Sequence, residues 1–195
     1  MPFTLTLMEI VDILIMTAVV GFIFKDIFRK PKSTGADYDP IAHYKQKAKS
    51  GFEDFKFAAM VTAPAIILHE FGHKIVAVAY GMDATFHAAY TWLGIGVLLK
   101  VLGTGLIFFV PAFVSISGDM TPLTHSAIAF AGPAVNLLLF FGAWALQKYG
   151  QLDKKWYAAV VLTKRINLFL FIFNMLPIPM FDGFKVYQGL LATFL

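Results

Sequence analysis

Long apolar runs constrain this chain more than any other feature of its sequence. About 20 apolar residues are needed to cross the hydrocarbon of a bilayer. The sequence has such runs at about residues 5–24, 57–82 and 126–147, and a fourth, broken by two prolines, from residue 166 onward. With 58% apolar and only 14% charged residues, it lacks the roughly 25% charged residues of a soluble domain. The sequence therefore predicts an integral, multi-pass membrane protein, and we expect the cell membrane as its location.

The basic residues gather in two segments between these runs. Residues 25–56 hold eight Lys or Arg and residues 148–165 hold five, whereas residues 1–24 hold none. If the apolar stretch 91–117 enters the membrane and returns, both basic segments share one side, as the positive-inside rule favours. Five residues of this stretch favour irregular or extended backbone over one clean helix: Gly94, Gly96, Gly103, Gly105 and Pro111. We predict an all-α polytopic fold of about four transmembrane helices, with a re-entrant or extended segment between the second and third.

Composition also suggests two parts. We expect residues 1–56 to form a first span and a basic loop, with a short amphipathic helix around 41–55, and residues 57–195 to form a membrane-embedded core. The N-terminus carries acids at Glu9 and Asp12 and no preceding basic residue, unlike a secretory signal. Basic loops that flank membrane spans account for the net charge of +4, so we expect a bilayer partner and no nucleic acid. The sequence leaves the oligomeric state open.

The second run contains the sequence HEFGH at residues 69–73. It matches H-E-x-x-H, in which two histidines, His69 and His73, project from one helical face toward a zinc ion. The intervening Glu70 is then placed to act as general base. Ionisable groups in mid-membrane are costly and are functional by default. The alternative is a helix whose polar residues pair with neighbouring helices.

A catalytic zinc usually has three protein ligands and one open position. The sequence contains no glutamate after Glu70 and no cysteine, and Ala79 stands where an extended motif would place a third histidine. The remaining downstream candidates are Asp83, His87, Asp119, His125, Asp153 and Asp182. Asp182 alone lies inside an apolar segment, directly after the proline-broken stretch, and we predict it as the third ligand. His87 fits a partnered structural histidine better than a gate.

Two further segments resemble a known family. Residues 174–183, NMLPIPMFDG, resemble the N-x-x-P-x-P-x-x-D-G signature of site-2 proteases, which are intramembrane zinc metalloproteases, and residues 131–136, AGPAVN, look like the family's G-P-x-x-N element. The resemblance covers about residues 57–195. It implies one Zn²⁺ held by His69, His73 and Asp182, with Glu70 as general base. It also implies that Asn174 assists at the substrate carbonyl, although this residue could instead end a helix by bonding local backbone. Asn136 could brace the site or join two helices, and Gly132 fits close packing or a kink.

The expected activity is hydrolysis of peptide bonds in or near transmembrane segments of a membrane protein substrate. The stretch 91–117 could supply a strand edge that pairs with the unwound substrate. Alternatives are a zinc peptidase with a downstream Glu ligand, a non-proteolytic zinc-binding scaffold, and a metal transporter. The missing downstream Glu, the presence of Glu70 and the absence of paired repeats argue against them in turn. The basic loops and the family resemblance disagree on which side of the membrane the site faces, so the orientation stays open.

Overall fold

Helices dominate the computed structural model, which describes residues 3–29, 40–105 and 110–195, with only the backbone given for 40–50 and 154. Its elements in chain order are α1 (Leu7–Phe24), α2 (Pro40–Ala79), β1 (Asp83–Ala88), α3 (Tyr90–Val101), β2 (Ala112–Ser117), α4 (Pro122–Tyr149), α5 (Lys154–Asn174) and α6 (Asp182–Phe194). Among the described residues, four helices are long and apolar enough to cross a membrane: α1, α2 from Gly51, α4 and α5. This confirms the predicted number of spans and fits a multi-pass membrane protein.

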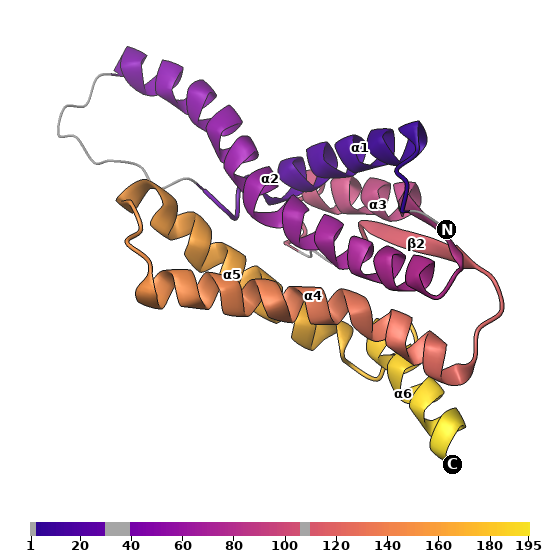
Figure 1. The fold of residues 1–195 in the computed structure, drawn as a ribbon. Coiled ribbons are helices and arrows are strands. Elements are labelled where there is room, and N and C mark those ends of the chain that lie inside the picture. Colours follow the sequence, from indigo (N-terminus) through magenta and orange to yellow (C-terminus); the bar gives the residue numbers. More distant parts are fainter. Residues whose placement is uncertain (1–2, 30–39, 106–109) are drawn as a thin grey trace.

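Helix α2, which carries HEFGH, lies between two groups of elements. Figure 1 shows α1, α3 and the small sheet on one side of it and α4, α5 and α6 on the other. Local chemistry sets several helix ends. Thr6 and Glu9 form a capping box that starts α1, and the Thr121 side chain caps α4, with Pro122 in its first turn. Helix α5 ends at Asn174, shortly before the two prolines.

Strands β1 and β2 form an antiparallel two-stranded sheet in which Asp83 pairs with Ser117 and Ala88 with Ala112. Residues 83 and 117 therefore lie at the same end of the sheet. Between the two strands, α3 runs alongside α1. The Tyr90 hydroxyl donates a hydrogen bond to Asp12 in α1, and Lys100 bonds Asp26 just beyond the end of α1.

The end of α1 and the α4–α5 turn at residues 150–153 lie at the same end of the molecule, and the α2–β1 turn and the start of α4 lie at the other (Figure 1). The two predicted basic segments thus begin at the same end, as expected for a segment that enters and returns.

One expectation about local structure is wrong in detail. Residues 91–117 are not irregular throughout, because α3 and β2 occupy most of the stretch, whose residues 106–109 lie outside the described residues. Gly103 and Gly105 adopt φ of +65° and +70° directly after α3. These glycines therefore end the helix rather than extend a strand. The predicted helical fold with an extended segment between the second and third spans is confirmed, and the extended part consists of β1 and β2.

Two helices are also longer than predicted. Helix α2 begins at Pro40, so the expected amphipathic helix at 41–55 is its continuation, and the expected boundary between residues 56 and 57 lies within it. The fourth span begins at Lys154 rather than after Arg165. Lys164, at the middle of α5, bonds Gln147 of α4, which gives this charge a polar partner inside the helix pair. Residues 30–39 of the predicted basic loop lie outside the described residues.

Candidate metal centre

Three side chains that are far apart in the sequence converge between α2 and α6. The Nε2 atoms of His69 and His73 lie 3.1 Å apart, and the Asp182 Oδ2 lies 3.1 Å from the first and 3.3 Å from the second. Zinc bonds of about 2.0–2.1 Å in a tetrahedron separate neighbouring ligand atoms by about 3.3 Å. The three atoms therefore fit one tetrahedral ion and leave its fourth position open. Among the described residues they form the one cluster of three or more such ligand atoms.

The second nitrogen of each ring is held by a hydrogen bond. His73 Nδ1 lies 2.7 Å from the Ile128 carbonyl oxygen, and His69 Nδ1 lies 2.5 Å from the Asn136 Oδ1. Asn136 is oriented in turn, because its amide nitrogen donates to the Ala65 carbonyl and to Asn167 Oδ1. With these acceptors opposite Nδ1, each neutral ring carries its proton there and presents a lone pair at Nε2.

Two lone pairs and a carboxylate oxygen thus face one another in a buried place. The Asp182 Oδ2 lies 3.1 Å and 3.3 Å from the two Nε2 atoms, and as a carboxylate it would complete a three-ligand set. Three electron-rich atoms at this separation repel one another unless a cation lies between them, which is the chemistry of a metal site.

Gly132 of α4 lies against the centre. A Cβ atom added to it would lie 2.3 Å from the His73 Nε2 and 2.7 Å from the His69 Nε2. The absence of a side chain is what allows α4 to approach the two rings this closely. The expectation of close packing at Gly132 is confirmed, and the packing partners are the two histidine rings of the candidate centre.

A cavity of about 380 Å³ opens beside the three ligands. Glu70 and Asn174 both line it and both are half-buried. Within the part of the chain that the structure describes, the Asn174 amide has no hydrogen-bond partner, so it is free to meet a bound molecule. His125 and Lys185 add polar groups to the lining, and Lys185 was not singled out from the sequence.

Strand β2 forms one wall of this cavity. The Ala89 N–H donates to the Pro111 carbonyl, and hydrogen-bonded pairs alternate along an antiparallel ladder. In the observed register, Phe113 and Ser115 therefore bond β1. The backbone groups of Val114 and Ile116 point away from β1, along an edge that no described strand pairs. The cavity thus has a metal centre on one side and open strand backbone on another.

The other predicted candidates lie elsewhere. His87 is a partnered structural histidine, because its Nε2 lies 3.0 Å from the Ser115 Oγ and its ring contacts Phe113. Asp83 begins β1 and Asp119 is exposed in the turn before α4. Asp153 is exposed and pairs with Lys155. Asn167, which orients Asn136, was missed. Its position four residues after Thr163, whose carbonyl it bonds, carries no sequence signal of a site.

Comparison with known proteins gives this centre a family. A protein of Methanocaldococcus jannaschii named "Putative zinc metalloprotease MJ0611" is 38% identical over 133 residues, which cover 68% of this chain and 69% of that protein. A protein of Synechocystis named "Putative zinc metalloprotease sll0528" is 29% identical over 132 residues, covering 68% of this chain and 30% of that protein. No family model and no solved structure matches the chain. The match to MJ0611 shows that this chain belongs to a family of zinc metalloproteases.

Proposed function

We propose that the chain is an intramembrane protease of the site-2 type, which hydrolyses peptide bonds in or near the membrane-spanning segments of other proteins. The observation that supports it most is the position of the centre. His69 lies ten residues before the end of the 29-residue span of α2, about 15 Å along the helix axis. A three-ligand metal site at that depth, with Glu70 beside it, suits a substrate that is itself in the membrane.

In this proposal His69, His73 and Asp182 hold one zinc ion. Zinc, when bound, supplies a Lewis acid that polarises a carbonyl group and acidifies water. The Glu70 carboxylate accepts the proton of the attacking water and passes it to the leaving amine nitrogen. The Asn174 amide, which has no partner among the described residues, donates a hydrogen bond to the substrate carbonyl oxygen as negative charge develops there.

The substrate is a locally unwound segment that adds to the open edge of β2. Val114 and Ile116, whose N–H and C=O groups face away from β1, line the same cavity as Glu70, so a strand paired there would run past the metal centre. The substitution Val114→Pro removes a backbone N–H that makes no hydrogen bond to β1. It should lower cleavage while leaving zinc content unchanged, whereas Val114→Thr, which keeps the N–H, should cleave normally. Equal cleavage by both variants would argue against substrate pairing at β2.

The activity is tested with purified protein in lipid vesicles and a model single-span substrate. Glu70→Gln should keep a full complement of zinc and lose about 10²–10⁴-fold in cleavage rate, the range for removal of a general base. A scaffold or a metal transporter would show no zinc-dependent cleavage by the unsubstituted protein. Cleavage that persists in Glu70→Gln would exclude the mechanism.

A further inference from the structure

Helix α1 buries two acidic side chains that the chemistry at the metal centre does not use. Glu9 is 1% exposed and Asp12 is 2% exposed, and both lie on a helix apolar enough to span a membrane. They are three residues apart and so share one face of α1. Charged groups are expensive at such positions and are retained where they perform a task.

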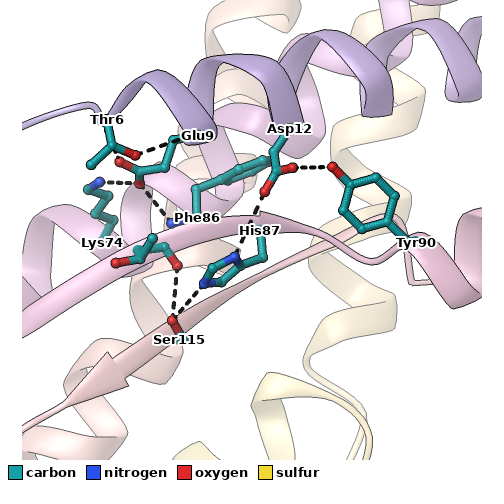
Figure 2. A network of polar contacts seen from close by, with 9 residues as sticks. Thr6, Glu9, Asp12, Lys74, Phe86, His87, Tyr90 and Ser115 are labelled. Carbon is teal, nitrogen blue, oxygen red and sulfur yellow. Dashed lines mark hydrogen bonds and ion pairs between the residues drawn. The ribbon is translucent and has the colours of Figure 1, made fainter.

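Glu9 contacts β1 directly (Figure 2). Its Oε1 accepts a hydrogen bond of 2.8 Å from the Phe86 N–H and another from the Lys74 ammonium group. Lys74 is itself buried and lies over the ring of Phe3. The other oxygen, Oε2, completes the capping box at Thr6. Glu9 thus joins the start of α1, helix α2 and strand β1.

Along the sheet, residues that bond the partner strand alternate with residues whose backbone groups face outward, and this alternation shows which edge Glu9 occupies. Phe86 pairs with Val114, and in this register the backbone groups of both residues point outward, on opposite edges of the sheet. The Phe86 N–H on the outer edge of β1 is occupied by Glu9. The Val114 edge of β2, toward the cavity, is left open.

Asp12 lies about one helical turn beyond Glu9 in α1 and contacts the end of β1 and the start of α3. It accepts the hydrogen bond from Tyr90, at the start of α3, and its Oδ2 lies 3.8 Å from the His87 Nδ1. His87 continues across the sheet to Ser115 of β2, and Figure 2 shows this path from α1 to the second strand. Both acids therefore fix the β1–β2 sheet relative to α1 and α2.

We propose that Glu9 and Asp12 are positioning residues for substrate, which block the outer edge of β1 and hold the free edge of β2 over the metal cavity. The inference rests on the proposed proteolytic function. The contacts of Glu9 and Asp12 thus act on the binding of an extended substrate and leave the zinc ligands and Glu70 unaffected. Contacts that only stabilise the fold would not have this selective effect.

The test replaces Glu9 and Lys74 together, because either charge left alone in the interior would disrupt folding. Glu9→Gln with Lys74→Met keeps an oxygen that accepts the Phe86 N–H, whereas Glu9→Leu with Lys74→Met does not. We expect the Leu pair to raise KM by about tenfold, the equivalent of roughly one net backbone hydrogen bond. Its kcat and zinc content should be unchanged, and the Gln pair should retain the KM of the unsubstituted protein. Thr6→Ala, which weakens the cap of α1 but spares the Phe86 contact, is the matched control and should also leave KM unchanged.

Hydrogen exchange gives a second readout that needs no activity. The Phe86 amide should exchange slowly in the unsubstituted protein and the Gln pair, and faster in the Leu pair. An ester bond in place of the amide at residue 86 removes the donor alone and should reproduce the raised KM, even if the Leu pair does not fold. An unchanged KM in the ester variant, or a loss confined to kcat, would overturn the proposal. If the unsubstituted protein cleaves nothing while Phe86 exchange follows Glu9 as described, the proposed function fails and not the placement of β1.

Discussion

Gly132→Ala adds a single methyl group and should strongly weaken metal binding. The added methyl group would lie 2.3 Å from the His73 Nε2 and 2.7 Å from the His69 Nε2, where contacts below 3.0 Å essentially never occur. The His73 ring must therefore retreat by at least 0.7 Å, from 2.3 Å to 3.0 Å, or α4 must move away from α2.

Neither ring is free to retreat. The hydrogen bonds from Nδ1 to the Ile128 carbonyl and to Asn136 tie both rings to α4, the same helix that carries Gly132. Ligand positions in a zinc site tolerate about 0.2 Å of error, which is well below the displacement required. Loss of one hydrogen-bond partner of a metal-ligating side chain already weakens metal affinity roughly 10–100-fold. With two ligands displaced at once, we expect the zinc affinity to fall by at least about 100-fold.

The assay is zinc competition against a chromophoric chelator in detergent, together with zinc per chain by mass spectrometry. Gly142→Ala is the matched control, because the same substitution in the same helix meets no atom within 4 Å. It should bind zinc normally and gain up to about 1 kcal/mol in stability from a better helix former. Normal zinc affinity in Gly132→Ala would refute the close approach of α4 to the two histidines.

Three further predictions follow from the same geometry. Asn136→Leu removes the acceptor that orients His69 and should lower zinc affinity about 10–100-fold; an unchanged affinity would show that the ring needs no such partner. Asp182→Asn should lose most bound zinc because the amide replaces a charged ligand, and a full complement of zinc would place the third ligand elsewhere. Single cysteines at Asp26 and Gln151 should react with a membrane-impermeant reagent from one side and a cysteine at Met120 from the other, since the end of α1 and the α4–α5 turn lie at one end of the molecule and the start of α4 lies at the other (Figure 1). Labelling of 26 and 151 from opposite sides would contradict the re-entrant path of residues 83–117.

The candidate metal ligands could be picked out from the sequence because it leaves few alternatives to them. The two histidines share a helical face by spacing alone, and the lack of any glutamate after Glu70 left few acids to choose from. The convergence of Asp182 with them at 3.1–3.3 Å agrees with that choice. The roles of Glu70 and Asn174 in catalysis stay predictions.

What could not be predicted depends on contacts between distant segments. Asn167 matters only because α4 and α5 pack side by side and bring it to Asn136. Glu9 and Asp12 look like stray charges in an apolar run until β1 is placed against them. The helix at residues 90–101 was missed because Gly94 and Gly96 weaken local helix propensity, whereas contacts with α1 stabilise the helix in the folded chain.

The site of cleavage in a substrate tests the central proposal most directly. A single-span model protein, reconstituted with the purified chain and zinc, would be cut and its fragments weighed by mass spectrometry. We predict a scissile bond within or at the border of the membrane-spanning segment, with no fragments formed by Glu70→Gln. Fragments that end only in the water-exposed flanks, or the same fragments from Glu70→Gln, would contradict an intramembrane protease built on His69, His73 and Asp182.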